Sequence, residues 1–290
     1  MVINYDFGEN YHKFTNLESN KLVASVPAYK SIFISDTHLG SRGAQAHHLN
    51  NFLQKYNSEN LFLVGDIVDG WRLEKKFFWP EQHTKVLEQI NKKALSGTHV
   101  HYLIGNHDES VKNFSDRGLN ISELDALAEN VTFETQIDYI GIDGKKYLVC
   151  HGDMFDTLMD SNTGRWVMFL GTASYDLLLY INTSVNFITR KLNLPYINIT
   201  GFAKRRAKAA CNLLLKFEGI LSNHASEKKY DGVICGHIHT PEIKNISGTV
   251  YMNSGDWVEN CSALLEHHDG SWEILNWRES HSKTKTSTHN

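Results

Sequence analysis

Five short motifs in this sequence bring together Asp, His and Asn, the residue types whose oxygen and nitrogen atoms hold divalent cations. In chain order they are Asp36-Thr37-His38, Gly65-Asp66-Ile67-Val68-Asp69, Gly105-Asn106-His107-Asp108, His151-Gly152-Asp153 and Gly236-His237-Ile238-His239. Imidazole and carboxylate ligands without sulfur suit Mn²⁺, Fe, Zn²⁺ or Co²⁺ better than Ca²⁺, which prefers oxygen. The motifs therefore predict a metal centre whose chemistry is the activation of water by bound cations.

The spacing within the motifs supports one shared centre, although each motif alone has an ordinary explanation. Asp-x-His and His-x-His place alternate residues on one face of an extended segment, so both side chains can reach the same point. A lone His-x-His is more often part of an ordinary strand, and Gly-Asn-His-Asp alone is usually a turn. The conjunction of five motifs, each following an apolar run, favours the metal centre. Glycines at positions 65, 105, 152 and 236 would let the backbone approach a ligand closely.

The apolar run before each motif is short and rich in β-branched and aromatic residues, which predicts a buried strand. Helix-like segments at 47–56 and 81–95 alternate with these strands, and this alternation predicts an α/β sheet. Later apolar runs follow one another without helices, which predicts a second, mixed sheet packed on the first. Ligands of open α/β sheets bind beyond the carboxyl ends of the strands, where all five motifs fall. The predicted strands are 31–35, 61–64, 100–104, 131–135, 147–150, 232–235, 249–252 and 271–275.

The pattern along the chain predicts one main domain over residues 29–279. Residues 1–28 are expected to form a polar lead-in, and residues 280–290 a disordered polar tail. Residues 154–223 differ from the rest, because they contain no strand that ends in a polar cluster. We therefore treat 154–223 as an inserted helical cap. Its helices are predicted at 165–180, 185–192 and 202–221.

Composition limits the class of protein. The chain has 290 residues, of which 41% are hydrophobic and 21% charged, which is ordinary for a globular protein with a core. Its net charge of −4 gives no overall basis for binding nucleic acid, so no such partner is expected. The four cysteines form no Cys-x-x-Cys pair, so neither a disulfide framework nor a cysteine-type zinc site is indicated. Without a signal-like or membrane-spanning apolar run, the protein is expected to be cytoplasmic.

The five motifs, in this order, resemble those of the calcineurin-like metallophosphoesterases over about residues 31–257. The resemblance implies a four-layer αββα sandwich around a dinuclear metal centre, with the helical cap as an insertion. The implied ligands of one cation are Asp36, His38 and His239, and those of the other are Asn106, His151 and His237, with Asp66 bridging both. Two divalent ions are expected, first of all Mn²⁺, with Fe or Zn²⁺ as alternatives because they share these ligands.

The family resemblance also implies a mechanism, in which two cations activate a water that attacks phosphorus. His107 is similar to the family's outer His, placed to protonate the leaving oxygen or to stabilise the transition state. Asp108 is a second candidate for catalysis and, with Asp69 and Asp153, a candidate for orienting ligand imidazoles. For each of these three Asp residues, a helix N-cap or a turn is an equally good interpretation.

Within the family, the chain is most similar to the branch of bacterial UDP-2,3-diacylglucosamine diphosphatases, peripheral membrane enzymes that split a pyrophosphate in lipid A synthesis. The block at 65–72, the His-Gly-Asp motif and the position of the insertion carry this resemblance. It implies a phosphoric anhydride substrate, UDP-2,3-diacylglucosamine or a related lipid-linked diphosphate. Because this chain has His107 where that branch typically has Arg, an enzyme acting on a nucleotide or another phospholipid stays open.

The predicted cap combines apolar and basic residues, which would suit an acyl chain attached to a phosphate or an anionic inner-membrane surface. The alternatives are a packed cap, whose apolar residues touch only each other, and a solvated basic face. The expected partner is a phosphorylated small molecule or lipid, with any membrane contact made through the cap. The candidate substrate-binding residues are Arg72, Trp166, Phe169, Lys204, Arg205 and Arg206.

Overall fold

The computed structural model describes residues 29–108, 131–158 and 199–280, with the side chains of 157–158, 199–211 and 213 left out of the description. The predicted lead-in (1–28), the predicted cap helices at 165–180 and 185–192, and almost all of the predicted tail lie outside the described residues. No helix in the described ranges combines the length and apolar character needed to cross a bilayer.

A six-stranded sheet forms the first half of the fold, in the order β11-β10-β1-β2-β3-β4. Strands β1 to β4 are parallel, β10 pairs antiparallel with β1, and β11 pairs antiparallel with β10. The parallel arrangement places the carboxyl ends of β1, β2 and β3 at one edge. The strands are β1 (Tyr29–Ile34), β2 (Ser58–Val64), β3 (His99–Leu103), β4 (Thr132–Glu134), β10 (Ser262–Glu266) and β11 (Trp272–Asn276).

A five-stranded sheet forms the second half, in the order β5-β6-β7-β9-β8. Its inner strands β6, β7 and β9 are parallel, and the two edge strands are antiparallel to their neighbours. The predicted second, mixed sheet is therefore present. Its strands are β5 (Gln136–Ile140), β6 (Lys146–Cys150), β7 (Gly232–Cys235), β8 (Glu242–Ile246) and β9 (Thr249–Asn253).

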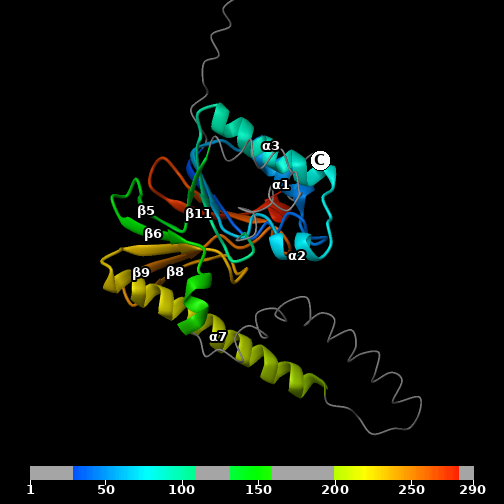
Figure 1. The fold of residues 1–290 in the computed structure, drawn as a ribbon. Helices are drawn as coiled ribbons and strands as arrows, with labels where there is room; N and C mark the ends of the chain where they lie inside the picture. Colours follow the sequence, from blue (N-terminus) through cyan, green and yellow to red (C-terminus); the bar gives the residue numbers. More distant parts are fainter. Residues whose placement is uncertain (1–28, 109–130, 159–198, 281–290) are drawn as a thin grey trace, which may run out of the picture.

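Helices cover the outer faces of both sheets (Figure 1). Helices α1 (Ala46–Lys55) and α3 (Glu81–Leu95) pack on the first sheet, close to where the sequence predicts them. Helix α7 (Ile199–Glu227) packs on the second sheet. Two short elements, α2 (Gly70–Lys75) and the 3₁₀ helix η2 (Asp153–Leu158), follow two of the predicted motifs. The predicted four-layer αββα sandwich is confirmed.

Alternation of side chains along the strands explains the layers. In β2, Leu61 and Leu63 face the helices, whereas Phe62 and Val64 face the space between the sheets. The central layer also holds Phe33, whose ring stacks on that of Phe62 with centroids 4.5 Å apart. Each fully buried side chain of this size contributes about 1.5–3 kcal/mol, so both faces of the sheet favour the sandwich.

Helix α7 is longer than the helix predicted at 202–221. Phe217, Leu221 and Ala225 recur every four residues and pack against the second sheet, in a core shared with Val233 and Tyr251. Phe217 and Leu221, which fall inside the predicted cap segment 154–223, therefore pack in the sandwich. The N-terminal part of α7 continues past the sheet, away from the body of the molecule (Figure 1).

Candidate metal centre

Loops from both sheets meet at one end of the sandwich. The amide of Asp36 donates to the carbonyl of Gly65, and the amide of His38 to that of Asp66, both at 3.0 Å, which ties the loops after β1 and β2 together. The amide of His237, after β7, donates to the carboxylate of Asp36 at 2.9 Å. The carboxyl ends of strands from both sheets thus build a single site.

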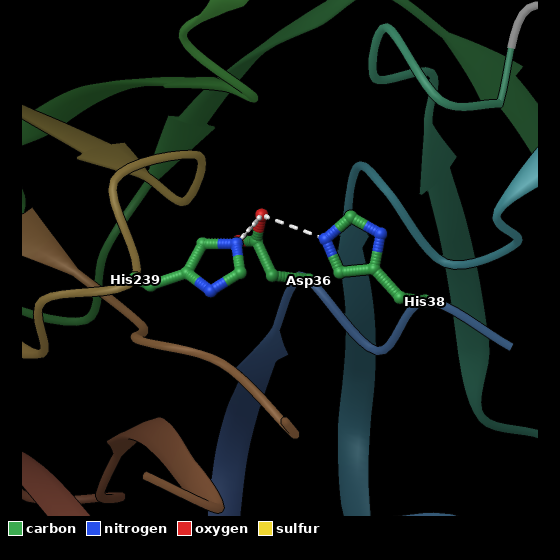
Figure 2. Close-up of side chains that lie close together, drawn as sticks. All are labelled: Asp36, His38 and His239. Carbon is green, nitrogen blue, oxygen red and sulfur yellow. Dashed lines mark ion pairs between the residues drawn. The ribbon is translucent and has the colours of Figure 1, made fainter. Parts of the chain in front are cut away.

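Asp36, His38 and His239 form a first cluster of metal-binding type, with ligand atoms within 4.8 Å of one another. Figure 2 shows both imidazoles turned toward the same carboxylate from opposite sides. Atom Nε2 of His239 lies 3.2 Å from Oδ1 of Asp36, and Nε2 of His38 lies 3.9 Å from the same oxygen. Because His239 follows β7 and the other two residues follow β1, the cluster spans both sheets.

Asp66, His151 and His237 form a second cluster within the same 4.8 Å limit. Atom Oδ2 of Asp66 lies 3.4 Å from Nε2 of His151 and 3.8 Å from Nε2 of His38. One carboxylate oxygen therefore faces imidazoles of both clusters, which is the position that a shared ligand requires.

His107 lies at the rim of the two clusters, in a third group with His38 and Asp66. Its backbone amide donates to Oδ1 of Asp66 at 2.9 Å, and its Nε2 lies 3.9 Å from Oδ2 of the same residue. Its Nδ1 lies 3.0 Å from Oδ1 of Asp69, so the second ring nitrogen is held by a carboxylate. Burial would lower the pKa of His107, but the hydrogen bond to Asp69 and the charge of Asp66 raise it. A protonated His107 can donate a proton into the site.

The carboxylates and imidazoles shift one another's pKa values. Burial alone would raise the pKa of Asp36, but His239 and His151 beside it hold that pKa at about 2. The pKa of Asp66 also lies well below its usual value, because His151 and His38 outweigh burial. Burial would lower the pKa of His239, yet Asp36 raises it to about 9. Ionised carboxylates at the centre are the state that cation binding needs.

Backbone strain is concentrated at the predicted ligands. Asp36, His38, Asp66, His237 and His239 have φ angles of 51°, 47°, 54°, 69° and 54°, in the left-handed region that residues with a side chain seldom adopt. Such conformations cost about 1–3 kcal/mol each and persist where the surrounding structure imposes them, most often at functional sites. These backbone conformations direct the side chains that follow β1, β2 and β7 toward the candidate metal centre.

Unpaired buried polar atoms test whether these residues fit a cation. Oδ1 of Asp36, Oδ1 of Asn106 and Nε2 of His151 are buried and make no hydrogen bond of normal geometry within the described residues, although the first and the third face other predicted ligands at 3.2 and 3.4 Å. His151 donates from Nδ1 to the carbonyl of Val64 at 2.9 Å, which leaves a lone pair on Nε2. Acceptor atoms of this kind are costly when nothing binds them. Three buried polar atoms without a hydrogen bond, all on predicted ligands, therefore fit a site built for divalent cations.

Two glycines let the backbone pass close to the ligands, as the sequence predicts. A Cβ atom on Gly105 would lie 2.3 Å from Oδ1 of Asp66, and one on Gly65 would lie 2.4 Å from the ring of His151. Gly65 also has a φ of 79°. A larger residue at either position would displace a predicted ligand.

Asp69 and Asp108, both candidates for orienting imidazoles, have different surroundings. Asp69 holds His107 and also accepts from the amide of Arg72 at 3.2 Å, so it is both an imidazole partner and the N-cap of α2. Asp108 instead accepts from backbone amides, including that of Val68 at 2.8 Å, and from the hydroxyl of Tyr102 at 2.8 Å. Burial raises the pKa of Asp108 to about 7. These contacts give Asp108 the task of fixing one loop against another rather than a contact with an imidazole.

The segment 253–257 supports the site from the end of β9. The Asn253 side chain donates to the carbonyl of Gly236 at 2.7 Å, next to His237. The amide of Trp257 donates to the carbonyl of Asp36 at 3.1 Å. This turn therefore braces the loops that carry both clusters.

Of the candidate substrate-binding residues, Arg72 is the one whose side chain the structure describes. Arg72 lies beside the centre, with its Nε 3.1 Å from Oδ2 of Asp69. Lys204, Arg205 and Arg206 lie on α7 with undescribed side chains, and Trp166 and Phe169 lie outside the described residues.

Two residues beside the centre were not predicted. Trp71 packs against His107 with ring centroids 4.3 Å apart, and Asp156 contacts His237. Trp71 directly follows a motif and could have been suspected, whereas nothing in the sequence marks Asp156.

Comparison with known proteins adds a family and several distant relatives. Residues 29–241 match the family model described as calcineurin-like phosphoesterase. A UDP-2,3-diacylglucosamine hydrolase of Hahella chejuensis is 25% identical over 253 residues, covering 85% of this chain and 96% of that protein. The DNA polymerase II small subunit of Thermoplasma acidophilum is 23% identical over 245 residues, covering 77% of this chain but only 44% of that subunit. Among solved structures, an archaeal phosphodiesterase aligns over 84% of this chain and 98% of its own, with 13% identity and a TM-score of 0.42.

Proposed function

The chain belongs to the calcineurin-like phosphoesterase family, and on that premise we propose that it hydrolyses a phosphoric anhydride with two divalent cations. The observation that carries the proposal is the position of Asp66, whose Oδ2 lies within 4 Å of imidazole nitrogens from both clusters. A single oxygen shared in this way is what a two-metal site needs. The proposed ligands are Asp36, His38 and His239 on one side, Asn106, His151 and His237 on the other, and Asp66 between them.

The cations, Mn²⁺ being our first expectation, would lower the pKa of water and neutralise charge on the phosphoryl oxygens. His107 would protonate the leaving oxygen, because Asp69 holds its Nδ1 and leaves Nε2 facing the centre. Asp69 thereby fixes the ring orientation and raises the pKa of His107, which favours the charged imidazole. Asp108 would contribute by holding the Gly105–Asp108 turn against the loop after β2.

The proposed substrate is UDP-2,3-diacylglucosamine or a related lipid-linked diphosphate. Support comes from the relative of that activity, which matches over nearly its full length, although at 25% identity. Beside the centre, Trp71 offers an aromatic ring that is 39% exposed, and Arg72 offers a cation, so an apolar or aromatic group joined to a phosphate would find contacts there. Contact of the 154–223 segment with a membrane surface remains part of this proposal.

A hydrolysis panel with added Mn²⁺ tests the proposal. The panel would include UDP-2,3-diacylglucosamine, a second lipid-linked diphosphate, cyclic and linear nucleotides, and simple phosphomonoesters. Asp66→Ala serves as the control for contaminating hydrolases. Turnover of the lipid-linked diphosphates alone would support the proposed substrate. Turnover of nucleotides without turnover of the lipid-linked diphosphates would favour the alternative substrate. No metal-dependent turnover of any compound would contradict the proposed function.

A further inference from the structure

Asp156 is a carboxylate beside the metal centre that no sequence motif includes. It lies on η2, and both of its oxygens are 3.0 Å from Nε2 of His237. We propose that Asp156 is a positioning residue, which holds the ring of His237 so that its Nδ1 is presented to the second cation. This inference rests on the proposed function insofar as that function supplies the cation.

Proton balance at His237 supports this role. An ionised carboxylate only accepts hydrogen bonds, so the Nε2 atom facing Asp156 must carry the proton. The neutral ring then has its lone pair on Nδ1. Imidazoles that bind metals commonly donate their other ring N–H to a carboxylate or a carbonyl, which fixes the tautomer and raises the basicity of the ligand nitrogen. His151 has the same arrangement in reverse, because its Nδ1 donates to Val64 and its Nε2 faces Asp66.

The surrounding structure fixes both partners of the Asp156–His237 contact. Phe155, next to Asp156, is 3% exposed within the core between α7 and the second sheet, and its amide donates to the carbonyl of Gly152 at 3.1 Å. On the other side, the amide of His237 is bonded to Asp36. A buried anchor beside Asp156 and a bound backbone at His237 leave the contact little freedom, which favours a built orientation over a chance encounter of two surface groups.

Asp156 has an alternative interpretation as a competitor of the metal. In that case Nε2 of His237 is the metal-binding atom, and Asp156 occupies it until a cation binds. The two readings predict opposite effects. A positioning residue strengthens metal binding, so its removal weakens it, whereas the removal of a competitor strengthens metal binding. Hydrogen-bond capacity favours positioning, because a neutral imidazole that donates from Nε2 to Asp156 keeps a lone pair on Nδ1 for a cation.

Metal titration of Asp156→Asn and Asp156→Ala separates these readings without any substrate. The measured quantities are the affinity of each Mn²⁺ site by calorimetry and the metal-to-protein ratio after dialysis. We expect the weaker step to lose about 10- to 100-fold in affinity in Asp156→Ala and less in Asp156→Asn, which keeps an accepting oxygen. Asp138→Asn is the matched control, because it removes one Asp charge from an ion pair with Lys146 on the outer edge of the second sheet.

Two outcomes would overturn the proposal: unchanged binding of both cations in Asp156→Ala, or tighter binding. Circular dichroism checks that the variants fold, and if the Ala variant does not, the Asn variant carries the test alone. Ring ¹⁵N shifts of His237 in the Zn²⁺-loaded protein give a second readout, with Nε2 expected to stay protonated. If Asp156→Ala weakens metal binding but the wild-type protein hydrolyses no phosphoester, the positioning role stands and the proposed function fails.

Discussion

The two sheets contribute different chemistry to the metal centre. The first sheet supplies both central carboxylates, Asp36 and Asp66, whereas the second supplies only imidazoles among the predicted ligands. The close pairs cross from one sheet to the other, with Asp66 3.4 Å from His151 and Asp36 3.2 Å from His239. The centre therefore forms where carboxylates from the first sheet meet imidazoles from the second.

The two halves also differ in how they are held. On the first sheet, Asp69 and Asp108 bind the surrounding turns and His107. On the second sheet, the imidazoles are held by a backbone carbonyl at His151 and by Asp156 at His237. The first half thus contributes the carboxylate charge and the candidate proton donor, and the second half contributes imidazoles whose ring nitrogens are held by hydrogen bonds.

Removing the shared carboxylate of Asp66 should have the largest effect on metal content and turnover. Asp66→Ala deletes the atom that faces both clusters, so both cations should be lost together and turnover should fall by more than about 10³-fold. Metal analysis and hydrolysis assays with the purified protein would measure this. Retention of two tightly bound ions in Asp66→Ala would rule out its shared position.

Removing the rim imidazole should separate catalysis from metal binding. His107→Ala is expected to lower kcat by about 10²- to 10⁴-fold, because it removes the proton donor while leaving the seven proposed ligands in place. Metal content should stay at two ions per chain. A variant with normal turnover, or one that binds no metal, would contradict this assignment.

Neutralising Asp69, the partner of His107, should change the pH dependence of activity. Asp69 raises the pKa of His107, so Asp69→Asn should lower that pKa. Because His107 acts when protonated, activity is lost as the pH rises through its pKa, and in Asp69→Asn this loss should begin at lower pH. A fall in kcat of about tenfold at neutral pH is expected. A pH–rate profile with an unmoved alkaline limb would argue against the pairing.

Asp108 should affect stability more than chemistry. Asp108→Ala leaves the amides of Val68 and Gly105 and the hydroxyl of Tyr102 without their acceptor, at a cost of about 1–3 kcal/mol in the free energy of unfolding. Tyr102→Phe, which removes only one of these bonds, should cost about 1 kcal/mol. Urea denaturation would measure both. A large loss of kcat in Asp108→Ala with unchanged stability would restore the catalytic interpretation.

The sequence predicts well which residues meet at the candidate centre, because motif, strand end and chemistry coincide at each of them. It predicts other parts less well. Strand β10 has buried polar residues, Ser262 and Glu266, at its two ends, so its apolar run is too short to mark a strand. It also pairs with β1 from more than 200 residues away. The edge strands β5 and β8 are polar and half-exposed, so they carry no apolar run.

Side-chain partners are the least predictable part of the site. Asp108 and Asp69 lie in similar motifs, yet only Asp69 reaches an imidazole, because the turn aims Asp108 at the amides of the neighbouring loop. Asp156 contacts His237 across 81 positions of chain, and only the packing of η2 brings them together. Such pairings depend on three-dimensional arrangement rather than on spacing.

The aromatic layer between the sheets has a consequence for the cations themselves. Phe33 and Phe62 stack face to face in that layer, and the loops that follow their strands carry Asp36 and Asp66. Both rings fill the space between the sheets, so their size contributes to the separation of the sheets and of the loops at their ends. Substituting these rings by smaller or larger ones would narrow or widen the gap, so preference among ions of different radius could be retuned by residues that never touch an ion.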